Sequence, residues 1–86
     1  MIKILDFYDT WCQPCKAMQP ILAEVKAETN IEIAPIKVSD NADVANKYGV
    51  RGLPCLIKVD SQSNMLGRLD GIHTKEEIIE WLKEND

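Results

Sequence analysis

The segment Trp11-Cys12-Gln13-Pro14-Cys15-Lys16 lies between a short apolar run and a long amphipathic pattern, and the rest of the chain is organised around it. Its two cysteines are separated by two residues, a spacing that can close a small disulfide ring or supply half of a metal site. Without a secretory signature, such a pair beside a strand and a helix is typical of thiol redox chemistry. Only Cys55 and His73 could complete four metal ligands. We therefore favour a redox pair and expect no metal.

The residues on either side of the cysteine pair predict a strand and a helix. The apolar run Lys3–Tyr8 predicts a buried strand, and apolar residues at helical spacing predict a helix that ends near Thr29. Ile31–Val38 predicts a second strand, in which Pro35 favours an edge position. A strand, a helix and a strand of this length imply parallel pairing with a right-handed crossover.

The second half of the chain predicts a short helix, a two-stranded hairpin and a final helix. The expected bounds are about Ala42–Tyr48 for the short helix, and Leu56–Val59 and Met65–Leu69 for the strands. Polar residues 39–41 can cap the short helix, and Gly49 can end it. Thr74 and Glu77 fit a capping box at the start of the final helix. The order βαβαββα with mixed pairing indicates the α/β class, and we treat residues 1–86 as one domain.

Composition and charge argue against some classes of binding partner and favour one cellular compartment. The net charge of −4 and the pI of about 4.9 argue against nucleic acid and anionic membrane surfaces. No apolar run approaches the roughly 20 residues that span a membrane, and the start of the chain does not resemble a signal peptide. Three cysteines are an odd number and form a poor disulfide framework. We expect a cytoplasmic protein, unless a leader was removed before this sequence begins.

The two cysteines occupy different places relative to the predicted helix. Cys12 lies at its start, where unpaired N–H groups and the helix dipole favour a thiolate. Cys15 lies one turn further in and is expected to be more buried. Pro14 is tolerated between them, because the first helical turn does not need its missing N–H. This placement predicts that Cys12 attacks a disulfide and that Cys15 resolves the mixed disulfide.

Asp6 is a carboxylate within the apolar run of the first strand. Burial would raise its pKa, because desolvation disfavours the charged form. Such a group can take the proton from Cys15 when that thiol attacks. The alternative is an aspartate at a strand end that reaches solvent.

These residues resemble the thioredoxin family. The cysteine segment is preceded by Asp6-Phe7 and followed by Pro20, as in that family. Tyr48-Gly49-Val50-Arg51-Gly52-Leu53-Pro54 is similar to the family's loop before its cis-proline, and Gly71 matches a glycine before the last helix. The resemblance covers nearly the whole chain and implies a minimal thioredoxin fold, a four-stranded mixed sheet flanked by three helices. It is minimal because the family's first strand and first helix have no counterpart in this sequence.

The resemblance also implies a function. It implies a thiol–disulfide oxidoreductase and electron carrier that reduces protein disulfides through Cys12 and Cys15, with Asp6 as the matching acid. Its partners would be disulfide-bearing protein substrates and a thioredoxin reductase that uses FAD and NADPH. No cofactor would be bound, the redox group would be the Cys12–Cys15 disulfide, and the protein would be a monomer. The implied substrate-contacting residues are Trp11, Gln13, Pro14, Leu53 and Pro54, with a cis bond between the last two.

Whether a lysine lies beside Asp6 stays open at this stage. The family often pairs this acid with a strand lysine. Counting forward from Pro20 gives Lys37, whereas counting back from Asp40 gives Ile36. Lys16 follows the cysteine pair, and its charge can favour the thiolate, although a solvated side chain is the simpler interpretation.

Other chemistry-bearing residues receive simpler interpretations. Cys55 follows Pro54 at a position where the family often has Thr. It is either a small buried hydrophobe, which we favour, or a third thiol that exchanges with the active-site disulfide. Tyr8 is expected in the core, and His73 is expected to be exposed and without a role.

Two other functions remain open at this stage. A glutaredoxin-like protein would be recharged by glutathione and would need a basic site for the glutathione carboxylates, for which the chain offers only Arg51 and Lys16. A non-catalytic binding subunit of a larger complex would keep its activity without either cysteine. The intact cysteine motif argues against this second alternative.

Overall fold

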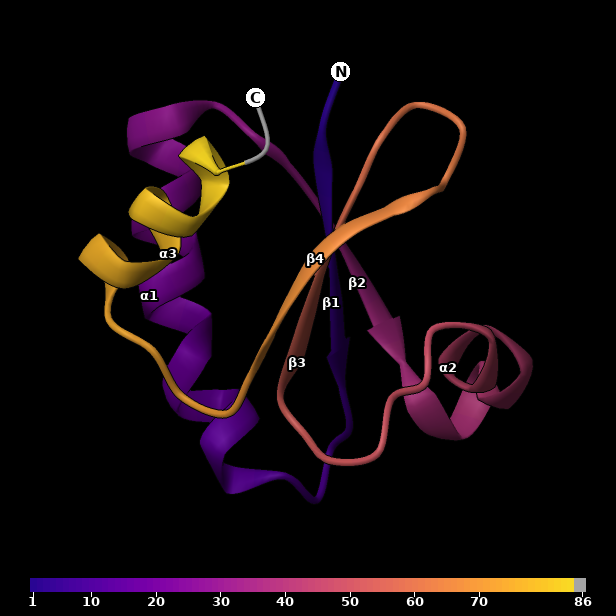
Figure 1. Ribbon diagram of the computed structural model, residues 1–86. Helices are drawn as coiled ribbons and strands as arrows, with labels where there is room; N and C mark the ends of the chain where they lie inside the picture. The colour runs from indigo at the N-terminus through magenta and orange to yellow at the C-terminus, as the bar shows by residue number, and fades with distance from the viewer. Residues whose placement is uncertain (85–86) are drawn as a thin grey trace.

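The computed structural model describes residues 1–84, and its helices and strands follow the βαβαββα order that the sequence predicts (Figure 1). The elements are β1 (Lys3–Tyr8), α1 (Gln13–Thr29), β2 (Glu32–Lys37), a 3₁₀ turn (Val38–Asp40), α2 (Ala42–Lys47), β3 (Cys55–Val59), β4 (Met65–Asp70) and α3 (Lys75–Lys83). Within this part of the chain, no helix combines the length and the apolar character needed to cross a membrane.

The four strands form one mixed sheet in the order β2-β1-β3-β4. β1 and β2 are parallel, and the other two pairs are antiparallel. Pro35 therefore lies on an edge strand, as predicted. The register places Phe7 opposite Cys55, and Cys55 opposite Asp70. The end of β1, the start of β3 and the end of β4 consequently meet at one edge of the sheet, and the cysteine loop follows β1 there.

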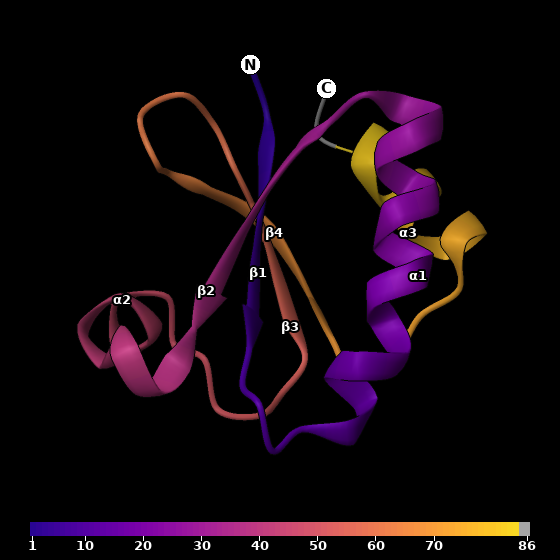
Figure 2. The same ribbon diagram turned by 180° about the vertical axis from the view of Figure 1, so that it is seen from behind.

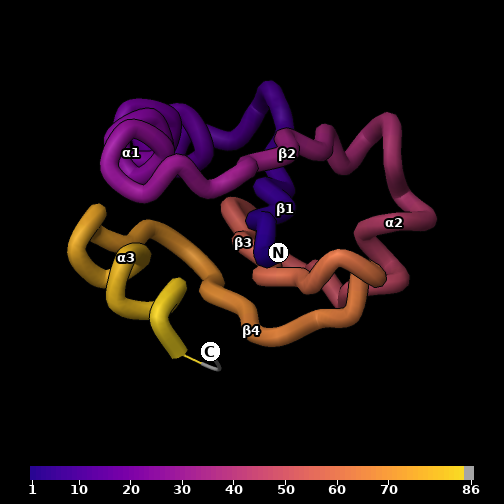
Figure 3. Tube along the Cα trace, turned by 90° about the horizontal axis from the view of Figure 1, so that it is seen from above, coloured from indigo at the N-terminus to yellow at the C-terminus, as the bar shows by residue number. Residues whose placement is uncertain are grey.

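The sheet separates two apolar clusters. α1 and α3 lie on one side of it and the short α2 on the other (Figures 2 and 3). The sequence pattern predicts Ile78, Ile79 and Leu82 as the buried face of α3. Ile78 and Trp81 are buried, whereas Ile79 and Leu82 pack at the margin of the same cluster. The cluster beside α1 and α3 contains Ile4, Met18, Leu22, Val25, Leu56, Ile78 and Trp81, and the other contains Leu5, Phe7, Ala45, Tyr48, Cys55, Ile57 and Val59.

The helix ends agree with the sequence except at α2. α1 stops at Asn30, which adopts the left-handed conformation with φ 60°. The capping box of Thr74 and Glu77 is present at the start of α3. Asn41, one of the polar residues 39–41 expected to cap α2, is its N-cap residue, but it makes no side-chain capping hydrogen bond. Its side-chain amide turns back and donates to the carbonyl oxygen of Lys37 at 2.9 Å.

Candidate active site

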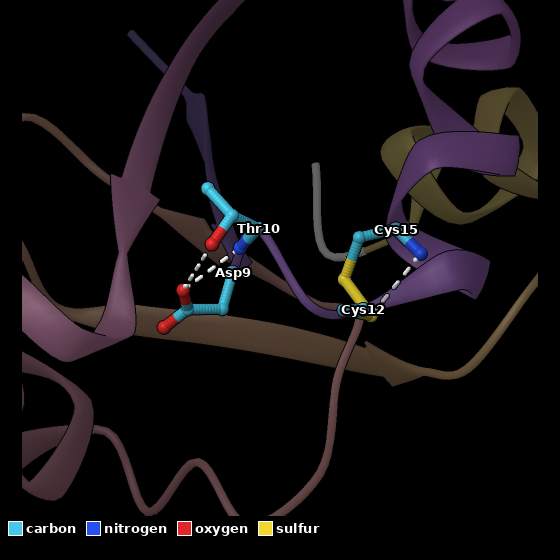
Figure 4. The surroundings of a disulfide bond; sticks show 4 residues. All are labelled: Asp9, Thr10, Cys12 and Cys15. Atoms are coloured by element: carbon cyan, nitrogen blue, oxygen red, sulfur yellow. Dashed lines mark hydrogen bonds between the residues drawn. A yellow bond between two sulfur atoms is a disulfide. The ribbon is translucent and has the colours of Figure 1, made fainter.

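The site is built around a disulfide between Cys12 and Cys15 at the N-terminus of α1 (Figure 4). Cys12 is the N-cap residue, and its Sγ accepts a hydrogen bond from the backbone N–H of Cys15 at 3.2 Å. Pro14 lies in the first helical turn and withholds no N–H that the helix needs. Unpaired N–H groups at a helix start favour negative charge. The geometry therefore favours a thiolate on Cys12 once the disulfide is reduced.

The burial of the two cysteines does not distinguish their roles. Cys12 and Cys15 expose 3% and 4% of their surfaces in the disulfide form, so the expected deeper burial of Cys15 is not observed. The position along the helix separates them instead, because only Cys12 occupies the N-cap.

Asp6 lies behind the disulfide on the side of the sheet that carries α1. It is half-buried, and it lines a pocket of about 210 Å³ together with Tyr8, Cys15, Gln19 and Pro35. Burial raises the pKa of Asp6 to about 6. The carboxylate thus shares a cavity with the inner cysteine and changes its protonation state near neutral pH.

The strand register settles which residue faces Asp6. Its partner on β2 is Pro35, and Lys37 is instead the partner of Tyr8. The Nζ atom of Lys37 lies 3.9 Å from a carboxylate oxygen of Asp40. Neither Lys37 nor Ile36 is therefore the cross-strand neighbour of Asp6. The prediction from the sequence left this open because counting residues along the chain does not fix the register between two strands.

The residues expected to contact substrate gather at the same edge of the sheet. Trp11 is 71% exposed, and Gln13, Pro14 and Lys16 are exposed beside it. Leu53 is half-buried and Pro54 buried, and the bond between them is cis. Because β3 starts opposite the end of β1, the Leu53–Pro54 loop and the cysteine loop lie at one end of the molecule (Figure 1). The backbone N–H of Gly71 donates to the carbonyl oxygen of Pro54 at 2.9 Å and ties β4 to this loop.

Cys55 is the free cysteine of the chain, and it is fully buried. It packs in the cluster on the α2 side of the sheet, which confirms the interpretation as a small buried hydrophobe. Its Sγ lies 3.7 Å from Nη2 of Arg68. Burial, with a contribution from Asp70, raises the pKa of the Cys55 thiol to about 11. The thiol is therefore neutral at physiological pH.

Two residues differ from their sequence-based interpretation. Tyr8 is only partly buried and lines the Asp6 pocket. His73 is also partly buried: its Nε2 lies 2.9 Å from the carbonyl oxygen of Asp70, and its Nδ1 lies 3.5 Å from a carboxylate oxygen of Glu77. Within residues 1–84, no group of three His, Cys, Asp or Glu residues is placed to hold a metal ion.

Asp9 is a further residue of the site that local sequence patterns did not indicate. Asp9 is only 4% exposed, and its carboxylate accepts hydrogen bonds from Thr10 and Ser39. Its backbone carbonyl oxygen accepts the N–H of Cys12 at 3.2 Å. The signal in the sequence is a carboxylate directly between a buried strand and the cysteine pair. The partner Ser39, 30 residues away, could not be found from local patterns.

Comparisons with known proteins agree with this geometry. The family model described as Thioredoxin matches residues 1–84. A thioredoxin of Staphylococcus aureus is 35% identical over 83 residues, which cover 94% of this chain and 79% of the relative. A thioredoxin of Rickettsia bellii is 27% identical over 84 residues, 95% of this chain and 79% of the relative. The solved structure of a mutant thioredoxin from Halobacterium salinarum NRC-1 superimposes with a TM-score of 0.87 at 27% identity, covering 95% of this chain and 72% of that one.

Proposed function

Because the chain belongs to the thioredoxin family, we propose that it reduces disulfides in proteins, with Cys12 as the attacking thiol and Cys15 as the resolving thiol. The chain is a thiol–disulfide oxidoreductase, and its redox group is the Cys12–Cys15 disulfide. The single observation that carries the assignment of roles is the hydrogen bond from the N–H of Cys15 to Sγ of Cys12 at the helix N-terminus.

The reaction proceeds in two exchange steps. The Cys12 thiolate attacks one sulfur of a substrate disulfide, forms a mixed disulfide and releases the other substrate sulfur as a thiolate. Asp6 takes the proton of Cys15, and the resulting thiolate attacks Sγ of Cys12 and releases the second substrate thiolate. The shared pocket and the pKa of about 6 support Asp6 as this base. The protein ends with the Cys12–Cys15 disulfide, and the substrate gains two electrons.

The substrate-contacting surface is proposed to combine Trp11, Gln13 and Pro14 with the Leu53–Pro54 loop. The exposure of Trp11 and the common edge of β1 and β3 support this surface. An extended substrate segment can pair with the backbone of Leu53 as a strand pairs with a sheet edge. Lys16, exposed beside the pair, is proposed to favour the thiolate by its charge. Lys37 is proposed to tune the site through its positive charge near Asp9 rather than directly on Asp6.

The partners and the compartment follow from the chemistry. Recharging the disulfide needs two electrons, which we assign to a thioredoxin reductase that carries FAD and uses NADPH, so this chain serves as an electron carrier without a bound cofactor. A dithiol that acts as a reductant is maintained in a reducing compartment, which favours the cytoplasm. The net charge of −4 supports proteins, rather than nucleic acid or membrane lipid, as the proposed substrates, and we propose that the chain acts as a single-domain monomer.

The test is a coupled reduction of insulin, with the rate followed under two electron sources. With NADPH and a thioredoxin reductase the wild type should turn over, and with glutathione, glutathione reductase and NADPH it should be at least about tenfold slower. Cys12→Ser should abolish turnover, and Cys15→Ser should accumulate a mixed disulfide with the substrate. Faster turnover with glutathione would favour the glutaredoxin-like alternative, and turnover that survives loss of both cysteines would contradict the proposal.

A further inference from the structure

Asp9 is a buried carboxylate that the two exchange steps do not use. It connects two loops that are distant in the sequence. One carboxylate oxygen, Oδ1, accepts the backbone N–H of Thr10 at 2.8 Å and lies 3.4 Å from the hydroxyls of both Thr10 and Ser39. The other, Oδ2, accepts the backbone N–H of Ser39 at 3.0 Å. The carboxylate thereby fastens the loop before α1 to the 3₁₀ turn after β2.

The same residue also holds Cys12. The N–H of Cys12 donates to the carbonyl oxygen of Asp9 at 3.2 Å and closes a turn directly before α1. Cys12 then occupies the N-cap, where its Sγ accepts the N–H of Cys15. Figure 4 shows the Asp9 carboxylate directed towards Thr10, with the disulfide on the other side of the loop. Asp9 therefore does not touch the reacting sulfur atoms and acts on them through the loop and through its charge.

The charge of Asp9 is permanent in the pH range in which thiols react. The backbone hydrogen bond from Thr10, those from Ser39 and the positive charge of Lys37 hold its pKa below the usual range. Lys37 is only a partial counter-charge, because its Nζ also lies 3.9 Å from Asp40. Asp6, on β1, has the reverse behaviour, with a pKa raised to about 6 by burial. The two carboxylates near the cysteine pair thus have different properties: Asp6 exchanges a proton, and Asp9 stays ionised.

We propose that Asp9 is a positioning residue of the redox pair. Its hydrogen bonds fix the loop before Cys12, and the negative charge of its carboxylate near that loop lowers the reduction potential of the Cys12–Cys15 pair. A negative charge disfavours a thiolate nearby. It therefore destabilises the dithiol form relative to the disulfide and makes the chain a stronger reductant. This inference rests on the Cys12–Cys15 pair being the redox group.

The experiment is the equilibrium with glutathione, in which the protein disulfide and two glutathione thiols give the protein dithiol and one glutathione disulfide. Asp9→Asn removes the charge and keeps the shape of the side chain. It should shift this equilibrium about fivefold towards the dithiol, which corresponds to about 20 mV at 29.6 mV per tenfold. The alkylation rate of Cys12 should also reach its plateau at lower pH than in the wild type.

The matched control is Asp40→Asn, which removes the same charge from an exposed carboxylate on the neighbouring turn. It should shift the equilibrium by less than about 1.5-fold. Equal shifts in both variants would reduce the effect to overall charge and overturn the inference. An unchanged equilibrium in a less stable Asp9→Asn protein would overturn it too, because Asp9 would then have only a structural role.

A second variant covers the case in which Asp9→Asn does not fold. Asp9→Ser keeps a short oxygen acceptor for the N–H of Thr10 and also lacks the charge, so it should show the same direction of shift. If neither variant folds, Asp9 is a structural residue and the inference fails. If the wild type does not exchange with glutathione or dithiothreitol at all, the redox function itself fails, and that result is distinguishable from an unshifted variant.

Discussion

The ammonium group of Lys58 donates a hydrogen bond to the backbone carbonyl oxygen of Trp81 at 2.6 Å and another to that of Glu84 at 2.7 Å. Lys58 is fully buried, and its Nζ lies 5.2 Å from the centroid of the Trp81 ring. The last carbonyl groups of a helix have no partners within it. A lysine on β3 therefore supplies the donors that the C-terminus of α3 lacks and joins the last helix to the sheet.

Lys58→Met should destabilise the fold without affecting redox chemistry. Methionine fills a similar volume but leaves the carbonyl oxygens of Trp81 and Glu84 without their donor, a loss of about 1–3 kcal/mol. Urea unfolding should show a lower midpoint with an unchanged slope. Lys83→Met, at an exposed position of α3, should change the free energy of unfolding by less than about 0.5 kcal/mol. Equal effects of the two variants would contradict the role of Lys58.

Asp6 should make the protein less stable at high pH. The folded state holds the Asp6 proton with a pKa of about 6, against 3.8 in the unfolded state. Stability therefore falls as pH rises from about 4 to about 6 and remains lower above that range. At pH 8, Asp6→Asn should raise the free energy of unfolding by about 3 kcal/mol, at 1.36 kcal/mol per pKa unit. At pH 3 the change should be under about 0.5 kcal/mol, and the same gain at both pH values would exclude titration of Asp6 as its cause.

Asp6→Asn should also slow the second exchange step. In the wild type, the release of substrate from the mixed disulfide should accelerate as pH rises through about 6, because Asp6 becomes able to accept the Cys15 proton. The variant should be about a hundredfold slower near pH 7 and should lack this inflection. Single-turnover quench experiments measure the step directly. Attack by Cys12 should keep its rate, and an equal loss in both steps would argue against a base for Cys15.

In the reduced protein at pH 7, iodoacetamide should modify Cys12 well before Cys15. Cys12 occupies the N-cap of α1, where helix N–H groups stabilise its thiolate. Peptide mapping after brief labelling gives the order, and faster modification of Cys15 would reverse the proposed roles.

Cys55 should be inert in the folded protein. It is fully buried and its thiol pKa is raised to about 11, so alkylation should occur only after unfolding. Oxidised protein should hold one thiol per chain, on Cys55, and only the Cys12–Cys15 bridge. Cys55→Ser should keep insulin reduction within about twofold. Burying the new hydroxyl should cost about 1 kcal/mol of stability. The cost should stay this small because Arg68 and Asp70 offer hydrogen-bond partners to the hydroxyl. A recovered Cys12–Cys55 peptide would overturn this assignment.

Patterns in neighbouring residues predicted the strand bounds and helix caps, because these features depend on residues close together in the sequence. The bounds of β1 at Lys3–Tyr8 and the capping box of Thr74 and Glu77 followed from periodicity and spacing. The bond from Asp9 to Ser39 and the burial of Lys58 against α3 could not be predicted, because their partners lie 30 and 23 residues away. The cross-strand neighbour of Asp6 was unpredictable for the same reason, since hydrogen bonding between strands determines the register.

The register of Phe7 opposite Cys55 has a consequence for motion. These two residues are cross-strand partners on the central strands β1 and β3, and the loops that leave that point carry Cys12 on one side and Pro54 on the other. Central strands open only when the domain unfolds as a whole. Bending or breathing of the sheet therefore displaces both loops together and preserves the gap between them. The attacking sulfur of Cys12 and the backbone near Pro54 that receives the substrate are thus anchored to the same pair of hydrogen-bonded strands, so we expect their relative orientation to change little as the molecule fluctuates.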